Sequence, residues 1–323
     1  MKVPDCRHQI VHNRVLVLAA AICIAVTSMS AQVKKPGVAP ATRSITVVSE
    51  PNAIVWIDNI KYGKTAGNGR LAISTIAPGR RVIRVRADGF KEISKTLLPN
   101  QRGDIEIPLA RTTDEAELAY QQAEALATTN REKAAEAYRK AMHLRPQFLE
   151  AHIGLARLYS EAGDSEKSEA ALKAARRLKP ASPEASVIEG RTLKDSGEDE
   201  RAVMLFKRAI TQSGGFQPEA HTGLGLIYKE RAERAGTSGD YDGEAANYTE
   251  AARHFTTAIK QLSGAPDAIV LYQFLGLVYE QQKKYKEAIA VYKEFLRFFP
   301  DSPESVAFES FIVQLQKQVN AQN

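Results

Sequence analysis

The sequence predicts a multidomain protein in which a small all-β sandwich is followed by an all-α solenoid of helical repeats. Three observations support this fold class. Short alternating apolar runs fill residues 44–111, helical segments rich in alanine, glutamate and lysine follow, and Pro146, Pro180 and Gly214 recur at equal intervals. The chain has 323 residues, enough for more than one domain, and its 44% hydrophobic and 25% charged residues are typical of a folded protein.

Residues 1–31 have the plan of a secretory signal peptide. Three basic residues precede an apolar run, Val15–Val26, and small residues follow it, so we expect cleavage after Ser30 or Ala31. This interpretation predicts an exported protein of the periplasm or the cell surface. The alternative is an uncleaved N-terminal membrane anchor, although a spanning helix needs about 20 apolar residues.

Charge and cysteine content separate the rest of the chain into regions. Residues 32–111 hold 14 basic and 6 acidic side chains, a net charge of +8, whereas residues 112–323 hold 27 basic and 31 acidic ones, a net charge of −4. Residues 32–43 contain proline and glycine without apolar periodicity and are predicted to be a flexible linker. Cys6 and Cys23 lie in the segment expected to be removed, so the mature chain would have no thiol for a disulfide, a zinc ligand or a nucleophile.

Six short runs in residues 44–111 predict the strands of the first domain. They are SITVVS, AIVWID, RLAIST, RVIRVRA, KEISKTLL and DIEIPL. Proline, glycine, asparagine and aspartate lie between them, as expected for turns. Several short strands at this spacing indicate a small β-sandwich.

Four motifs in this domain carry a family resemblance. They are SEPNAIVWID at Ser49–Asp58, Gly63-Lys64-Thr65, Ala77-Pro78-Gly79 and Asp88-Gly89-Phe90. With these motifs the segment resembles the PEGA family, a small β-sandwich module of bacterial and archaeal surface or envelope proteins. The sequence departs from the family at Pro51-Asn52-Ala53, which lacks the Glu-Gly pair, and at Asn59. Because asparagine tolerates left-handed turn geometry, both departures preserve the expected backbone.

The helical region repeats a pattern of small and large side chains. In the first helix of a pair the small position holds Ala156, Gly190, Gly225 or Gly276, and in the second it holds Ala134, Ala202, Ala251 or Ala288, with Ser168 as a substitute. Tyr138, Leu172, Phe206, Phe255 and Tyr292 follow as large side chains. A period of about 34 residues is typical of tetratricopeptide helix pairs. Small residues let helices approach closely, and stacked pairs bury an apolar stripe that one pair cannot bury alone.

Four to five such pairs are predicted across residues 112–300. An insertion at about 231–248 lengthens the fourth pair, and its GTSGD core predicts a loop on one face of the solenoid. Phe295 stands where other repeats have alanine, which predicts a bulkier contact with the last helix. Residues 301–323 are predicted to form an amphipathic helix that caps the stack.

The resemblance to tetratricopeptide repeats implies that the first helices line a concave groove. The predicted groove positions are Arg157, Arg191, Lys194 and Lys229, followed by Leu226, Phe274 and Leu277. A basic patch that grades into an apolar one predicts binding of an extended peptide. The competing interpretation is a solvated helix face with ordinary repeat packing.

A second candidate surface lies in the β domain. The run RVIRVRA places Arg84 and Arg86 on one face of a strand and Ile83 and Val85 on the other, with Arg80 nearby. This basic surface would suit an anionic envelope polymer. A solvated strand face is the alternative.

No catalytic or cofactor motif occurs in the sequence, so we expect a protein that is not an enzyme and needs no cofactor. His152 and His221 are interpreted as half-buried packing residues, and no metal site is predicted. Nucleic acid is not expected as a partner of a protein that leaves the cytoplasm. The sequence therefore predicts an exported scaffold whose solenoid binds a protein or peptide in the cell envelope, without a membrane span after cleavage. The alternative function is envelope-polymer binding by the basic β domain, with the solenoid as a spacer.

Overall fold

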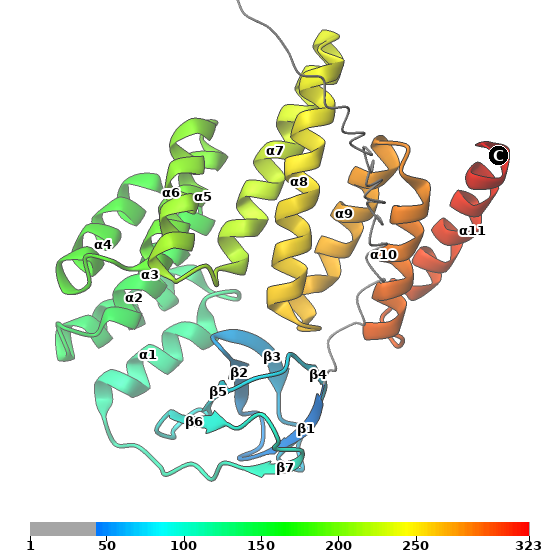
Figure 1. The fold of residues 1–323 in the computed structure, drawn as a ribbon. Helices are drawn as coiled ribbons and strands as arrows, with labels where there is room; N and C mark the ends of the chain where they lie inside the picture. Colours follow the sequence, from blue (N-terminus) through cyan, green and yellow to red (C-terminus); the bar gives the residue numbers. More distant parts are fainter. Residues whose placement is uncertain (1–42, 323) are drawn as a thin grey trace, which may run out of the picture. The chain divides into compact units, whose positions relative to one another are not determined.

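The computed structural model describes residues 43–322, which belong to one compact unit running from Pro40 to Asn323 (Figure 1). The predicted signal peptide, 1–31, lies outside the described residues, and so does the predicted linker apart from Arg43. Within the described residues, β-strands come first and helices follow. This order is the one expected from the sequence.

The first domain is a sandwich of two sheets, as predicted. Its strands are β1 (Arg43–Val48), β2 (Ile54–Ile57), β3 (Ile60–Lys64), β4 (Arg70–Ile76), β5 (Arg81–Arg86), β6 (Ile93–Leu97) and β7 (Gly103–Glu106). One sheet has the order β4-β1-β7, with β1 antiparallel to β4 and parallel to β7, and the other has the order β3-β2-β5-β6 with antiparallel neighbours. The core holds Val47 and Ile73 of the first sheet and Val55, Ile83 and Val85 of the second. This domain is called the sandwich below.

Strand β3 was not among the six predicted runs. Its sequence, IKYGK, has one buried side chain, Ile60, and therefore little apolar alternation. A tight turn joins it to β2, and Asp58 and Asn59 adopt positive φ angles of 50° and 67° there. Both residue types tolerate this left-handed conformation, which a two-residue hairpin turn requires.

The second domain is a stack of five helix pairs and a final helix, and the prediction of a helical-repeat solenoid is confirmed. The pairs are α1 (Glu115–Leu126) with α2 (Arg131–Leu144), α3 (Leu149–Glu161) with α4 (Ser165–Leu178), α5 (Pro183–Asp195) with α6 (Asp199–Gln212), α7 (Pro218–Ser238) with α8 (Tyr241–Leu262), and α9 (Ile269–Gln281) with α10 (Tyr285–Phe298). A short 3-10 helix, η1 (Pro266–Ala268), leads into α9, and α11 (Ser305–Gln322) ends the stack.

The predicted glycine positions lie directly against large side chains of the second helix of each pair. A Cβ atom added to Gly190, Gly225 or Gly276 would lie 3.0 Å or less from a ring atom of an aromatic side chain on the second helix of the same pair. These aromatic partners are Phe206, Phe255 and Tyr292. A methyl group would overlap the ring at Gly225 and Gly276 and would make a tight contact with the ring at Gly190.

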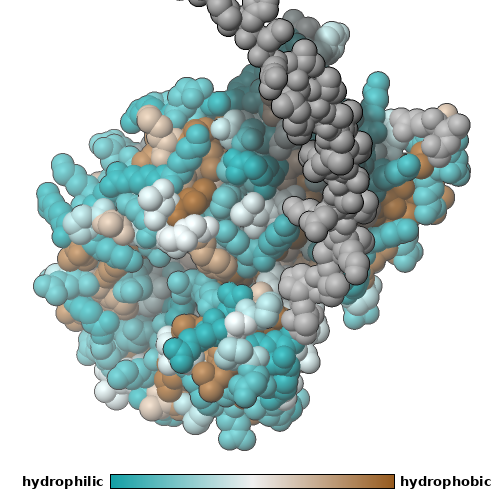
Figure 2. Space-filling view, in the orientation of Figure 1, coloured by the Kyte–Doolittle hydropathy of each residue, from teal (hydrophilic) through white to brown (hydrophobic). Residues whose placement is uncertain are grey.

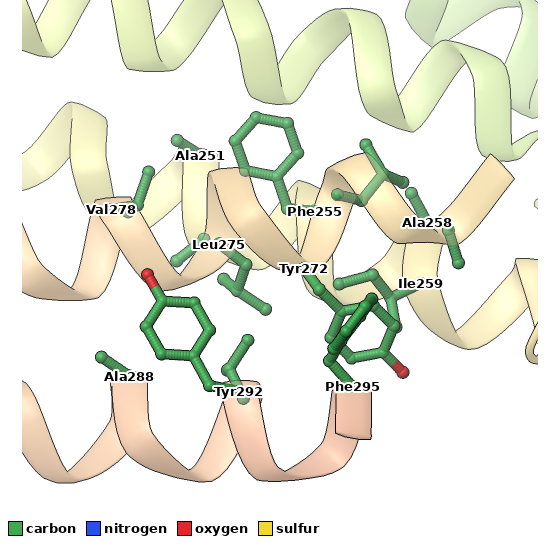
Figure 3. Close-up of a cluster of buried hydrophobic side chains, with 14 of the residues drawn as sticks. Ala251, Phe255, Ala258, Ile259, Tyr272, Leu275, Val278, Ala288, Tyr292 and Phe295 are labelled. Atoms are coloured by element: carbon green, nitrogen blue, oxygen red, sulfur yellow. The ribbon is translucent and has the colours of Figure 1, made fainter. Parts of the chain in front are cut away.

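Large side chains fill the space between the last pairs (Figure 3). Phe295 stacks on Phe308 of α11, with ring centroids 3.9 Å apart and planes 15° from parallel. The expected bulkier contact with the last helix is therefore present. Phe308, Ile312 and Leu315 of α11 are buried, whereas Val306 is 75% exposed and does not share the buried face.

The fourth pair differs from its prediction. The inserted residues do not form a loop; they extend α7 to 21 and α8 to 22 residues, against 12 to 14 in the other paired helices. The turn is confined to Gly239 and Asp240, where Gly239 has a φ angle of 81°. Ala232 and Tyr248 are buried on the longer helices, so apolar packing continues into the insertion.

Candidate functional site

The sandwich contacts the solenoid at two separate places, and the first contact is with α1. Arg86 of β5 is 3% exposed and pairs with Glu124 of α1, with an N–O distance of 3.2 Å. Its guanidinium also lies over the rings of Trp56 and Tyr120, 5.0 Å from each centroid. The Gln121 side chain accepts a hydrogen bond from the Gly89 N–H and donates one to the Phe90 carbonyl.

The second contact joins the edge strand β3 to the segment between α8 and α9. Ile60 is buried within the apolar cluster of α8–α11. The Tyr62 hydroxyl donates to the Leu262 carbonyl at 3.2 Å, and burial raises the pKa of Tyr62 to about 12, so this hydroxyl stays protonated at neutral pH. Gly264, with a φ angle of 79°, lies against the Thr75 side chain. The sandwich therefore contacts the first and the last repeats at once.

A cleft of about 910 Å³ lies between these two contacts. Its sandwich wall consists of the β2–β3 turn with part of β5 and Ser94 of β6. Its helix wall consists mainly of the first turns of α5 and α7, the η1–α9 segment, and Arg157 of α3. We refer to this space as the cleft.

The four predicted groove cations are all paired within the chain. Arg157 donates two hydrogen bonds to the Glu219 carboxylate, at 2.7 and 3.1 Å, and Arg191 pairs with Glu161 at 3.2 Å. Lys194 pairs with Glu230 at 3.1 Å and Lys229 with Glu233 at 2.6 Å. The expected basic patch is therefore neutralised by carboxylates of neighbouring turns and helices.

The Arg157–Glu219 pair joins α3 to α7 across the intervening pair. The Glu219 carboxylate raises the pKa of Arg157. Burial tends to raise the pKa of Glu219, but the guanidiniums of Arg157 and Arg191 outweigh burial and hold this pKa below its ordinary value. Both groups are therefore charged at neutral pH. The two side chains are 35% and 38% exposed, so solvent screens their attraction.

The three apolar groove positions do not join the cations in one binding surface. Leu226 and Phe274 are half-buried against the α8–α11 cluster, and the Phe274 ring lies 5.7 Å from that of Phe255. Leu277 is 37% exposed. Of the seven predicted groove residues, Arg157 alone lines the cleft.

The predicted basic surface of the sandwich is divided among three environments. Ile83 and Val85 point into the core, as the alternation predicted, and the arginines lie on the opposite face. Arg80 is exposed, but Arg84 stacks on Trp56 at 4.0 Å and pairs with Glu92 at 2.9 Å. Arg86 is not available to a polymer, because α1 covers the part of the sheet where it lies.

Two buried histidines meet in the solenoid, and no local pattern in the sequence indicated their contact. The Nδ1 atoms of His221 and His254 lie 2.9 Å apart. Burial lowers the pKa of His221, and burial with the Arg253 charge lowers that of His254 to about 4. Within the described residues, no group of three potential metal-ligating side chains comes together. Because both pKa values are lowered, the two rings are neutral at neutral pH, and one Nδ1–H donates a hydrogen bond to the other Nδ1.

The residues that line the cleft were mostly missed by sequence reasoning. A usable signal was present in the repeated dipeptides Pro183-Glu184, Pro218-Glu219 and Pro266-Asp267. Each places proline at the first position of a helix and a carboxylate beside the helix N-terminus, where both are favoured. Pro183-Glu184 and Pro218-Glu219 line the cleft with both residues, and the third dipeptide lines it with Asp267.

Most of the surface seen in Figure 2 is hydrophilic, with small hydrophobic patches between the polar side chains. Among the described helices, none is both long and apolar enough to cross a bilayer.

Comparison with known proteins supports the repeat assignment. Two family models described as tetratricopeptide repeat match residues 125–187 and 237–303. Neither range includes the sandwich, so its similarity to the PEGA family stays a prediction. No curated protein matches the chain.

Several solved structures are similar to part of the chain. Yeast Tom70 is 18% identical over 64% of this chain, with a TM-score of 0.51, and the chain spans 41% of the length of that protein. The TPR protein TTC0263 of Thermus thermophilus is 18% identical over 61% of this chain and 99% of its own length, with a TM-score of 0.45. The MamA protein is 22% identical over 58% of this chain and 94% of its own length, with a TM-score of 0.40.

Of these likenesses, the one to Tom70 bears on the fold, and on the fold alone. The two family matches and the stacked helix pairs agree with each other along the solenoid. No catalytic family is indicated by them. The chain therefore contains tetratricopeptide repeats within residues 125–187 and 237–303.

Proposed function

We propose that this chain is an exported, non-enzymatic scaffold that binds an extended segment of an envelope protein in the cleft. The binding proposal depends on the cleft itself. This space has a volume of about 910 Å³ and lies between the sandwich and the first helices of several pairs. Ligand sites commonly have volumes of about 300–1,000 Å³. A cleft of this size accommodates a few residues of a polypeptide.

The walls of the cleft offer apolar side chains to such a segment. Val82 of β5 is 45% exposed and Val270 of α9 is 46% exposed, and both line the cleft from opposite walls. The half-buried Phe216 lines it as well. Burying exposed apolar surface favours association by roughly 25 cal/mol per Å² before the costs of binding are subtracted.

The cleft is a better candidate than the rest of the concave face. The cations predicted for that face are engaged by carboxylates of the chain itself, so a partner would have to displace them. Binding of an envelope polymer by the sandwich has less support, because Arg86 is buried and Arg84 is paired.

Export in this proposal depends on the signal-peptide pattern of residues 1–31. Mass spectrometry of the protein isolated from fractionated cells measures its N-terminus. The expected result is a chain in the envelope or secreted fraction that begins at Ala31 or Gln32. A full-length chain in the cytoplasmic fraction would contradict export and leave the binding proposal intact.

Selection from a random peptide library tests the binding proposal. The control variant is Val313→Trp, which adds a tryptophan ring at an exposed position of α11 outside the cleft. Peptides selected on the purified chain should bind this control with unchanged affinity. They should lose binding after Val270→Trp, which fills the cleft. Selection of no peptide, or of peptides indifferent to Val270→Trp, would reject the cleft as the binding site.

A further inference from the structure

We propose that the cleft selects an uncharged, aliphatic extended segment, and that Lys61 and Asp267 set this selectivity by balancing each other at the end of the cleft where β3 contacts η1. This inference depends on the proposed function and specifies its ligand. It differs from the sequence prediction, in which a basic patch was to bind the partner.

The charged side chains of the cleft other than these two already have partners. Arg157 is engaged by Glu219, Arg84 by Glu92 at 2.9 Å, and Asp58 by Arg81 at 3.0 Å.

Glu184 accepts a hydrogen bond from the Ser182 hydroxyl and lies 3.9 Å from the Lys179 ammonium. A charged ligand group would therefore meet carboxylates and cations that are already neutralised. Taking that charge out of water without a free counter-charge is unfavourable.

Lys61 and Asp267 are the remaining charged side chains of the cleft, and they determine the net charge that a ligand meets there. Lys61 is exposed on β3, and Asp267 lies in η1 on the helix wall. Among the described residues, neither side chain makes a hydrogen bond or an ion pair. The two side chains lie on elements that contact each other, β3 and η1, at one end of the cleft. Burial raises the pKa of Asp267, and the nearby Lys61 charge opposes this rise.

Aliphatic side chains of the ligand fit the remaining surface. Val82 on the sandwich wall and Val270 on the helix wall supply this exposed surface, whereas Ile60, Leu262 and Leu271 line the space but are buried. In an extended segment, successive side chains point to opposite sides. Alternate residues of one ligand strand can therefore contact the two walls.

The test uses three capped octapeptides without terminal charges. The first alternates serine and valine, and the other two carry lysine or glutamate in place of one central serine. Fluorescence anisotropy against the purified chain should give the tightest binding for the uncharged peptide. Binding should change little between low and high salt, about 50 and 500 mM, because no net charge is neutralised.

Removing one member of the pair should create a charge preference with a defined sign. Lys61→Met should favour the lysine peptide over the glutamate peptide by about two- to fivefold relative to the unchanged chain, and Asp267→Asn should favour the glutamate peptide by a similar factor. The double variant should restore equal affinities for the two charged peptides.

Two control variants match these substitutions outside the cleft. Lys64→Met lies on the same strand, and Asp242→Asn occupies the corresponding early position of α8. Both should leave the three affinities unchanged.

Several results would overturn the inference. One is tighter binding of a charged peptide by the unchanged chain, and another is selection of charged sequences from the random library. Charge preferences that do not shift with Lys61 or Asp267 count against it as well. In each case the proposed function stands if Val270→Trp still abolishes binding. Self-association of the chain that Val270→Trp abolishes would instead make a second copy the occupant of the cleft.

Discussion

The two ends of the solenoid have the same helix-pair geometry but different cores. In the buried cluster of the first repeats, alanine forms the majority, and the aromatic members are Tyr138 and Phe148. In the buried cluster of the last repeats, alanine is a minority, and aromatic side chains are almost as numerous as alanines. Aromatic side chains bury far more apolar area than alanine does. Equal geometry therefore does not mean equal stability.

The first repeats have the alanine-rich core, which buries less apolar area, and the sandwich supports this end of the solenoid with polar contacts. Arg86 and the backbone at Gly89 and Phe90 all contact α1. Tyr138 of α2 donates a hydrogen bond to Glu124, so the same network reaches the next helix. The first pairs therefore depend on the sandwich, while the last pairs depend on their own aromatic packing.

The largest expected effect comes from truncating the aromatic core. Phe295→Ala removes a fully buried ring stacked on Phe308 and should lower the free energy of unfolding by about 4 kcal/mol. Urea unfolding followed by circular dichroism measures this change. A loss below about 1 kcal/mol would contradict the view that aromatic packing holds the last repeats.

A smaller effect is expected at the contact between the sandwich and α1. Glu124→Gln leaves the buried Arg86 without its carboxylate and should cost about 2 kcal/mol, less than for a fully buried pair because Glu124 is 33% exposed. Hydrogen exchange should accelerate in α1 and α2 and stay unchanged in α9 and α10.

Glu250→Gln removes an exposed, ion-paired carboxylate of α8 and serves as its control. This control should change neither region. Uniform acceleration after Glu124→Gln would mean that the two ends are not separable.

The smallest expected effect is the dependence of the unfolding free energy on pH that comes from His221 and His254, which lie between the first and the last repeats. Burial lowers the pKa of His221 and that of His254, the latter to about 4, whereas unfolded histidine titrates near 6.5. Below pH 6.5 the unfolded chain therefore binds protons that the folded chain does not. Stability should fall as the pH drops from about 6.5 to about 4, by about 1–2 kcal/mol between pH 7 and 4.5.

His254→Gln should remove most of this slope, as measured by urea unfolding at the two pH values. His143→Gln changes an exposed histidine of α2 and should preserve the slope. A slope that survives in the first variant would assign the pH dependence to other groups.

The features that were predicted from the sequence depend on contacts within one repeat. Gly190, Gly225 and Gly276 were recognised because the same pattern of small and large side chains recurs in each helix pair. The exception is the fourth pair, where the turn residues of the insertion predicted a loop. Helix formation continued there because Ala232 and Tyr248 gave the added turns a buried face.

The features that were not predicted depend on contacts between repeats or between domains. Arg157 and Glu219 are 62 residues apart, and their pairing follows from the curvature that brings α3 near α7. No local pattern reports that curvature. The burial of Arg86 likewise depends on where α1 lies, which the alternation of a single strand does not specify.

Because the sandwich is attached to the solenoid at two places, the number of repeats between these places is restricted. Solenoids generally tolerate the gain or loss of whole repeats, because each repeat contacts only its neighbours. Here the sandwich touches α1 through Arg86 and the α8–η1 segment through Tyr62. Duplication of a repeat between these points would separate the two attachment sites by one helix pair, and a rigid sandwich could not reach both. The number of repeats in this stretch is therefore fixed by the size of the domain that spans it.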